Sequence, residues 1–282
     1  ATKMAYIPGA TPSKVLIPGK KALVRNTDNK FLSVVSDKYR PLQNIEAFDF
    51  FDSFLQQGVA ALESAGSLME GKRVWVLAKI TDMVEDVVPD DKVEAYLLLS
   101  NGHDGKVAVR VMFTPIRVVC WNTHSAAEAN ADRGLSQSVR IIHSGNLKAS
   151  MKVVEKAIDT AHQTFNFTIE DYRAMARKDI SVDGLKRYVR AVFDIPEEVT
   201  EMPRAFEMIE AGFDNGPGAR IANVHGTVGG AYNAVTNWVD HQRGRTEESR
   251  LAATWFQPSV GPLFRKRAHT AAMDMVEGSL LN

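Results

Sequence analysis

The chain has 282 residues, of which 45% are hydrophobic and 24% are charged. These fractions are ordinary for a globular protein, and they exclude a disordered chain, which would be poorer in apolar residues and carry an excess of one charge. The 34 Lys and Arg are balanced by 34 Asp and Glu. This balance excludes a protein that holds a polyanion by bulk charge, so any such site must be local.

Cysteine usage and hydropathy narrow the protein class further. The single cysteine, Cys120, excludes a disulfide within the chain and a zinc site built from cysteines. The first residues lack an apolar signal core, and no stretch approaches the roughly 20 apolar residues of a membrane helix. We therefore expect a cytoplasmic protein with no membrane partner.

The charge balance is the sum of unequal blocks. Residues 14–40 contain seven Lys and Arg and two Asp, whereas residues 41–71 contain five Asp and Glu and no Lys or Arg. Neighbouring blocks of opposite charge can neutralise each other within one chain, which is the commoner arrangement. Alternatively, the basic segment docks on the acidic segment of a neighbouring subunit or contacts a polyanion.

The N-terminal region combines an irregular arm with a hairpin and a helix. Residues 1–20 are rich in Pro and Gly, which is typical of an irregular arm. A β-hairpin is predicted from Ala22–Arg25 and Phe31–Val35, on either side of an Asn-Thr-Asp-Asn turn. Asn44 is a good helix N-cap, and apolar residues then recur at helical spacing until Gly58.

The middle of the chain changes to a period of two. Arg73–Ile80, Val93–Ser100 and Lys106–Phe113 are predicted to form an antiparallel meander, with a strong turn before the third strand. One face of this meander is entirely apolar. The other face carries cations and aromatic rings, namely Arg73, Trp75, Lys79, Tyr96, Lys106 and Arg110.

The following segment is predicted as a helix and a short strand. Thr114 and Pro115 have the residue types of a helix N-cap and first helical position, which predicts a helix over residues 116–129. Val139–Ile142 has the composition of a short strand.

The second half of the chain is predicted to be helical. Lys148–Phe165 forms one helix, and Thr168 opens another, with an acid three residues later. Further helices are predicted over residues 185–193, 204–211, 227–241 and 262–277. A sheet-rich first half and a helical second half predict an α+β fold, an antiparallel β-meander with packed helices and a helical C-terminal half.

Three regions are predicted from this order of elements. Residues 1–40 form an N-terminal arm and hairpin, residues 41–165 form an α+β core that would hold single-stranded DNA, and residues 166–282 form a helical C-terminal region.

Motifs for catalysis are weak. His124 follows Cys120 by four residues and could serve as its base, but no carboxylate is spaced to orient it. Asp240 and His241 form a lone pair at a predicted helix end. The glycine-rich Gly226–Gly230 could hold an anion at a helix N-terminus, although close helix packing is the commoner use of such glycines. The seven His are scattered, so neither a metal site nor a cofactor is predicted.

The mixed face of the meander suits single-stranded DNA. Such sites need cations that follow the phosphates and aromatic rings that stack on bases. The alternative is a sheet face covered by the C-terminal helices, with Trp75 in the core and Lys79 extending its charge to solvent. The candidate DNA-binding residues come from the meander and the segments that follow it: Lys72, Arg73, Trp75, Lys79, Tyr96, Lys106, Arg110, Arg117, Trp121, Asn122, His124, Arg133, Arg140, Lys148 and Lys152.

Three stretches together carry a family resemblance. They are Tyr39–Asn44 (YRPLQN), Arg117–Thr123 (RVVCWNT) and Gly226–His241 (GTVGGAYNAVTNWVDH). Over nearly its whole length the chain resembles the phage/plasmid-like family built on domain of unknown function 932. The resemblance implies a bacteriophage, prophage or plasmid source and a location in the cytoplasm of a bacterial host cell. It implies no established activity.

A more distant similarity concerns the order of elements. A helix, a three-stranded meander and another helix resemble the β-β-β-α core of single-strand-annealing recombinases, the superfamily of Rad fifty-two and the phage annealases. This is a fold-level analogy. It implies a ring or helical filament that holds single-stranded DNA in a basic groove with the bases exposed for pairing.

Our first hypothesis is therefore a single-stranded DNA-binding and strand-annealing protein that acts as an oligomer without covalent chemistry. The second is a nucleic-acid- or nucleotide-processing enzyme, with chemistry around His124, Asp240 and His241. The third is a structural or host-interaction protein in which the charge blocks serve assembly alone.

Overall fold

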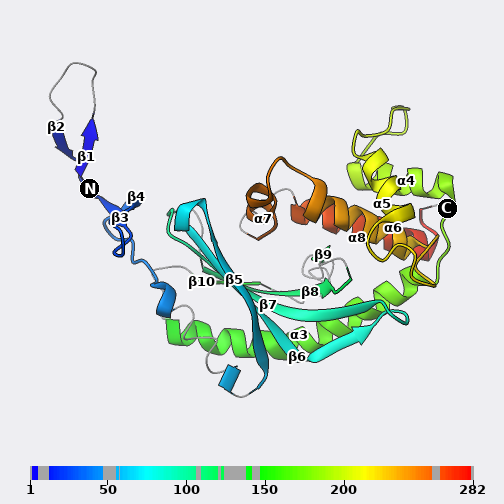
Figure 1. Cartoon of the computed structure of the whole chain (residues 1–282), viewed down its shortest axis with the longest axis horizontal. Coiled ribbons are helices and arrows are strands. Elements are labelled where there is room, and N and C mark those ends of the chain that lie inside the picture. The colour runs from blue at the N-terminus through cyan, green and yellow to red at the C-terminus, as the bar shows by residue number, and fades with distance from the viewer. Residues whose placement is uncertain are drawn as a thin grey trace.

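An antiparallel sheet forms the middle of the molecule, with a long helix along one side and shorter helices on the other (Figure 1). The structure is a computed structural model. It describes residues 2–5, 13–46, 55–56, 58–105, 109–119, 122–123, 138–141, 147–255 and 261–280. The predicted α+β class is confirmed, because strands dominate the first half and helices the second.

The central sheet has six strands in the order β10-β8-β7-β6-β5, with β9 paired to β8. All of its pairs are antiparallel, and the predicted meander is β6-β7-β8. The strands are β5 (Ala60–Leu68), β6 (Arg73–Asp86), β7 (Lys92–Gly102), β8 (Val109–Arg117), β9 (Asn122–Thr123) and β10 (Ser138–Ile141).

Two strands of this sheet, β5 and β9, were not predicted. β5 lies at the sheet edge, and a single 3-10 turn, η1 (Met69–Gly71), connects it to β6. Most of its side chains are exposed, and only its two end residues, Ala60 and Leu68, are buried. The strand therefore lacks the apolar alternation that marks a half-buried strand.

The helix predicted over residues 116–129 is wrong at its start. β8 continues through Thr114 and Pro115, which pair with Tyr96 and Ala95 of β7. Strand pairing thus overrides the helix-start signal of the Thr-Pro dipeptide. Residues 122–123 form β9, and residues 124–129 lie outside the described part of the chain.

The apolar face of the meander is covered by α3 (Leu147–Ala176), a helix of 30 residues. Phe113 of the sheet meets Phe165 of α3 edge-on, with ring centroids 6.5 Å apart. The two helices predicted here are one, because Thr168 does not act as a cap: its hydroxyl donates to the carbonyl oxygen of Thr164, 2.8 Å away. The buried residues of this interface are Val76, Ala78, Ile80, Leu97, Leu99, Val111, Phe113, Ala161, Phe165 and Ile169.

The helical C-terminal half packs on the end of α3. Its aromatic centre is Trp238, whose ring lies 5.4 Å from the rings of both Phe193 and Phe264. One helix, α7, was not predicted. The elements are α4 (Val182–Phe193), α5 (Phe206–Asn215), α6 (Val228–Asn237), the π-helical turn η3 (Trp238–Gln242), α7 (Glu247–Trp255) and α8 (Gly261–Glu277).

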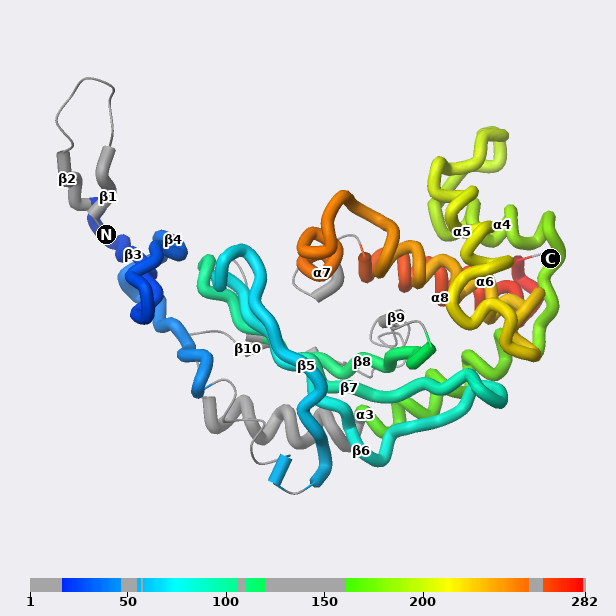
Figure 2. Tube along the Cα trace, viewed as in Figure 1, coloured from blue at the N-terminus to red at the C-terminus, as the bar shows by residue number. Residues whose placement is uncertain are grey.

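The β3–β4 hairpin lies at the end of the molecule opposite the C-terminus (Figure 2, blue at the left). The predicted hairpin is confirmed as β3 (Lys20–Val24) and β4 (Phe31–Ser36). The arm expected to be irregular instead pairs β1 (Thr2–Ala5) with β2 (Ser13–Leu16).

The helix predicted after Asn44 is helical at residues 44–46 and 55–56. The residues between these two pieces lie outside the described ranges.

The β3–β4 hairpin is anchored to the turns at one end of the sheet. Lys30 Nζ lies 3.0 Å from Glu70 Oε2, and the Ser33 hydroxyl donates to the carbonyl oxygen of His103 at 2.9 Å. The Tyr39 hydroxyl donates to the carbonyl oxygen of Gly102 at 3.3 Å. The Lys30–Glu70 pair shows that the basic and acidic blocks meet within one chain, which is the commoner of the two arrangements considered.

The predicted boundary at residue 165 falls inside α3. One buried apolar cluster also runs from the sheet through α3 into α6 and α8. The division into three regions stays a prediction. None of the described helices is long and apolar enough to span a membrane.

The glycines at the start of α6 allow close packing. The first donors of the helix are used within the chain: Val228 N donates to the carbonyl oxygen of Lys178 at 2.8 Å, and Gly230 N donates to the Thr227 hydroxyl at 3.2 Å. A Cβ on Gly230 would lie 2.6 Å from the carbonyl oxygen of Val224. This favours packing over anion binding as the role of the glycine-rich segment.

Gly230→Ala is therefore expected to destabilise the protein by about 1 to 3 kcal/mol, because the new methyl group has no space. Gly212→Ala is the control and should leave stability nearly unchanged, since its Cβ would lie 3.8 Å from the nearest atom, Ala234 Cβ, which is an ordinary van der Waals contact. Urea unfolding measures both. Equal stability of Gly230→Ala and the wild type would contradict the packing role.

Candidate functional site

The sheet face opposite α3 carries the predicted mixture of cations and aromatic rings. Backbone register aligns one residue from each of five strands in a single row across this face. Residues directly opposite each other in antiparallel strands point to the same side of the sheet. The row is Gly66, Trp75, Ser100, Arg110 and Arg140.

Two arginines are neighbours in this row. Arg110 of β8 is the direct register partner of Arg140 of β10, and Arg110 is half-buried. Like charges at directly opposed positions destabilise a sheet. The side chain of Arg140 lies outside the described part of the structure, so only the backbone pairing of these two positions is established.

Trp75 has a packing role in the same row. A Cβ on its neighbour Gly66 would lie 2.8 Å from the indole, so the ring covers this glycine. Trp75 is half-buried and packs with the cluster of Leu68 and Ala252, the latter from α7. At this part of the face, the structure agrees with the alternative considered from the sequence, in which Trp75 is covered by a C-terminal helix.

At the turn end of the face, Arg73 forms a nearly buried ion pair. Its Nη2 lies 3.0 Å from Asp104 Oδ2, and the two side chains are 6% and 11% exposed. Lys72, the preceding residue, is half-buried. The charge of Arg73 is thus compensated within the chain.

Lys79 and Tyr96 converge on one carboxylate. Lys79 Nζ donates to Glu94 Oε1 at 2.6 Å, and the Tyr96 hydroxyl donates to Glu94 Oε2 at 2.8 Å. Burial works against ionisation of Glu94, but these two hydrogen bonds hold its pKa below the ordinary value near 4.5. Burial and the Glu94 charge raise the pKa of Tyr96. This end of the face is therefore neutralised.

Arg117 is the most deeply buried cation of the predicted set, with 1% of its surface exposed. Its Nε donates to Asp91, and its two terminal nitrogens reach the carbonyl oxygens of Pro217 and Gly218, each at 3.3 Å. Burial raises the pKa of Asp91, against the effect of Arg117. Arg117 thus ties β8 to the segment before α6.

The remaining predicted residues are described by their backbone or lie outside the described ranges. Asn122 is in β9, and Lys148 and Lys152 are in the first turns of α3. Four residues lie outside the described part of the chain: Lys106, Trp121, His124 and Arg133.

A polar network that the sequence reasoning missed lies among α3, α6, η3 and α8. Arg265 Nη1 donates to Asp240 Oδ1 at 2.6 Å, and His269 Nε2 lies 3.2 Å from Asp171 Oδ2. All four side chains are at most 10% exposed. The members come from helices far apart in sequence, so the sequence does not show that they meet. Asp240, within the Gly226–His241 stretch, is the one member that the sequence analysis singled out.

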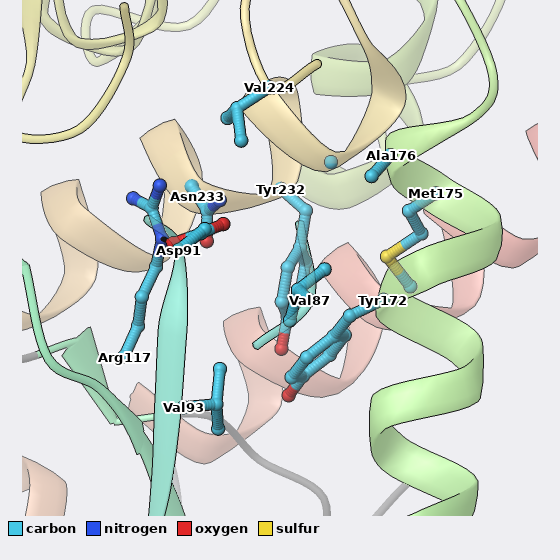
Figure 3. A pocket seen from close by; sticks show the side chains of 11 residues that line it. Val87, Asp91, Val93, Arg117, Tyr172, Met175, Ala176, Val224, Tyr232 and Asn233 are labelled. Carbon is cyan, nitrogen blue, oxygen red and sulfur yellow. Dashed lines mark hydrogen bonds and ion pairs between the residues drawn. The ribbon is translucent and has the colours of Figure 1, made fainter. Parts of the chain in front are cut away.

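Two tyrosines connect this network to a small cavity (Figure 3). The rings of Tyr172 and Tyr232 lie 5.5 Å apart, and burial raises the pKa of both hydroxyls. The cavity has a volume of about 20 Å³, and Asp91 and Arg117 form part of its wall. Asp91 is paired with Arg117, and the network acids Asp240 and Asp171 lie against Arg265 and His269. This arrangement favours a role in stability over a role in proton transfer.

An open cleft of about 580 Å³ lies beside the start of α6. It is lined by Arg173, Arg177, Asp179 and His225, among others. Arg173 Nη2 is already bound to Glu85 Oε2 at 2.9 Å. Charges of both signs thus line this cleft, and it lacks the concentrated positive charge of a polyanion site.

Of the enzyme candidates, the structure describes only Asp240 and His241. Asp240 is bound to Arg265, whereas the adjacent His241 is exposed. His124 and Cys120 lie outside the described ranges. Among the described residues, no group of three or more His, Cys, Asp or Glu is placed to hold a metal ion.

The three family stretches hold the described fold together. Asn44 Oδ1 lies 2.8 Å from His103 Nε2, Arg117 joins the sheet to residues 217–218, and residues 226–241 form α6 and η3. Comparison with protein families matches residues 31–255 to the family described as Domain of unknown function (DUF932). The chain belongs to the DUF932 family. Comparison of this DUF932 protein with curated proteins finds no match, and comparison with solved structures also finds none.

Removing Arg117 should destabilise this DUF932 protein strongly. Arg117→Ala leaves Asp91 buried without its partner, and we expect a loss of about 3 to 5 kcal/mol in the free energy of unfolding. Urea denaturation measures the loss. The exposed Arg177→Ala is the control and should change stability by less than about 0.5 kcal/mol. Similar small effects of both variants would refute a structural role for the ion pair.

The Glu94 cluster predicts a pH-dependent stability. Because the folded-state pKa of Glu94 lies below its ordinary value near 4.5, ionised Glu94 stabilises the fold above that pH. The contribution is lost as the pH falls through the folded-state pKa. Glu94→Gln should therefore cost about 1 to 2 kcal/mol at pH 7 and progressively less below pH 4.5. Unfolding curves at a series of pH values test this, with the exposed Glu170→Gln as the control. A cost that does not change with pH would contradict it.

Proposed function

We propose that this protein binds single-stranded DNA and promotes the annealing of complementary strands, acting as an oligomer without covalent chemistry. The observation that supports it most directly is the row that places Arg110 beside Arg140 on the sheet face that also carries Trp75. We further propose a phage or plasmid source and action in the bacterial cytoplasm, in line with the family resemblance.

The row has the chemistry that single strands require. In this proposal Arg110 and its register partner Arg140 neutralise phosphates, and Lys72 adds a cation at the turn end of the same sheet. Trp75 lies two strands from Arg110, about 10 Å at the usual strand spacing. A strand of DNA that crosses the row would meet the two cations first. Its bases would stay outward for pairing, with stacking on Trp75 as a further contact.

Cations that already have a carboxylate partner within the chain are not proposed as the main phosphate contacts. Arg73, Lys79 and Arg117 each have a carboxylate partner, so each pair adds little to the positive potential of the sheet. The proposed contact therefore concentrates on the β8–β10 side of the sheet. This is a short positive segment, which accords with a net charge of zero for the whole chain.

Fluorescence anisotropy with a labelled oligonucleotide tests the binding. We expect the wild type to prefer single strands to duplex and to bind more weakly as salt rises, because phosphate contacts release counterions. A second assay follows the rate at which complementary strands anneal, which should rise with added protein. Absence of single-strand binding at low salt would overturn the proposal.

Arg110→Ala tests the site itself. Losing one phosphate contact should weaken single-strand binding by about tenfold, or about 1.4 kcal/mol, and reduce the slope of log K against log salt by about 0.7. Arg110→Lys keeps the charge and should retain most of the salt dependence. Lys186→Ala removes an exposed cation of α4 and is the control for general charge. Equal losses in Lys186→Ala and Arg110→Ala would place the contact elsewhere.

A further inference from the structure

Surfaces of opposite charge lie at the two ends of the longest axis of the molecule. The first, which we call the basic end, is the β3–β4 hairpin and its flank, residues 20–40 (Figure 1, left). The second, the acidic end, is residues 195–215, which comprise the segment between α4 and α5 and α5 itself (Figure 1, upper right). Each end carries both charge and exposed apolar side chains.

The basic end contains six Lys and Arg and two Asp. Its large exposed apolar side chains are Val24, Phe31 and Val34, which are 48%, 54% and 43% exposed. Val24 is the register partner of Phe31, and Val34 pairs with Ala22, so these residues lie on the same side of the hairpin. Such a cluster on a two-stranded hairpin marks an interaction surface.

The hairpin presents this side in a fixed orientation. Its opposite side is buried, with Leu23, Leu32 and Val35 clustered against Tyr39. The contacts of Lys30 and Ser33 with the sheet turns, described above, hold it in place. The apolar side thus faces away from the rest of the described chain.

The acidic end contains six Asp and Glu and one Arg. Val199 and Met208 are 43% and 45% exposed within it. Arg190 of α4 fixes the segment by donating to the carbonyl oxygen of Pro196 at 2.6 Å. The exposed acids of this end are Glu197, Glu198, Glu201, Glu207 and Asp214.

We infer that the basic end of one molecule docks on the acidic end of a second copy of this chain. The two surfaces match in charge sign, and both add exposed apolar side chains that the contact would remove from water. They lie at opposite ends of one molecule, so they cannot meet within it. The resulting contact joins different surfaces of the two copies. Repetition of such a head-to-tail contact closes a ring or continues as a helical filament.

A second copy of the chain would contact both the charged and the apolar side chains of the basic end, whereas a nucleic acid would contact mainly the charged ones. Phosphates would pair with Lys20, Lys38 and Arg40 but would leave the exposed valines in water. A nucleic acid also leaves the acidic end without an occupant. Because Glu70 is already bound to Lys30 of its own chain, the acids of residues 195–215 are a separate set available to another molecule.

This inference rests on the proposed function in one respect, namely that the protein is an oligomer, and it names the surfaces that form the oligomer. The DNA-binding proposal and the proposed contact between copies can be refuted separately. Loss of DNA binding in Arg110→Ala concerns the sheet, whereas particle mass without DNA concerns the two ends.

Charge exchange between the ends tests the contact. One variant reverses the basic end with Lys20→Glu and Lys38→Glu, and the other reverses the acidic end with Glu198→Lys and Glu201→Lys. All four side chains are exposed, so folding should be unaffected, which thermal unfolding checks. Particle mass is measured by light scattering and sedimentation without DNA, over a range of protein concentrations.

We expect the wild type to exceed the monomer mass of 31.1 kDa, and each single-end variant to associate at least about tenfold more weakly because like charges now face each other. An equimolar mixture of the two variants should associate again, since each reversed end meets an oppositely reversed one. A chain with both ends reversed should also recover. The control reverses Lys92 and Glu170, two exposed charges away from both ends, and should assemble as the wild type.

A wild type that stays monomeric would overturn the inference, and so would an oligomer whose mass is unchanged by reversal of the acidic end. Recovery in the mixture is the result that only a contact between the two ends predicts. Phe31→Ser should weaken association even at about 1 M salt, where the Debye length falls to about 3 Å. If Phe31→Ser assembles like the wild type, the apolar part of the contact is refuted.

Discussion

The fold depends on the burial of one apolar sheet face beneath one long helix. The apolar residues of the meander lie together on one side, and the described α3 side chains that cover them include Ala161, Phe165 and Ile169. α3 also contacts α6 and α8, and α4 packs on α8. The opposite face is then free to differ in chemistry along its length.

That opposite face divides into two parts because of where carboxylates lie. Glu94 neutralises the end that carries Lys79 and Tyr96, and Asp104 compensates Arg73 at the turn end. Between them, the β8–β10 side places Arg110 beside Arg140. The register that pairs these two arginine positions is a reason to look for an anion on this side of the sheet, whereas a cation already bound to a carboxylate is not.

The strands of the meander and their two faces could be predicted from the period-two alternation, since this pattern is local. β5 could not, because an edge strand with exposed side chains carries no such pattern. The extent of α3 was also missed, since Thr168 has the sequence of a cap but bonds back to the preceding turn. The adjacency of Arg110 and Arg140 needs the register of two strands, and the burial of Arg117 needs Asp91, 26 residues away. Sequence reasoning reached the face of the site but not which of its charges are compensated.

The net charge of zero is the sum of three groups of charged residues that lie in different places. Some charges pair inside the chain, as Lys30 does with Glu70 and Arg265 with Asp240. A second set lies on the sheet, where the row of Arg110 is positive over a short distance. The third set lies at the two ends of the longest axis, with the exposed Lys20, Lys38 and Arg40 at one end and the acids of residues 195–215 at the other. These two groups are too far apart to pair within one molecule, and the inferred contact would pair them between molecules. The proposed head-to-tail assembly would then neutralise the ends and leave the sheet cations of successive copies as the positive surface for single-stranded DNA.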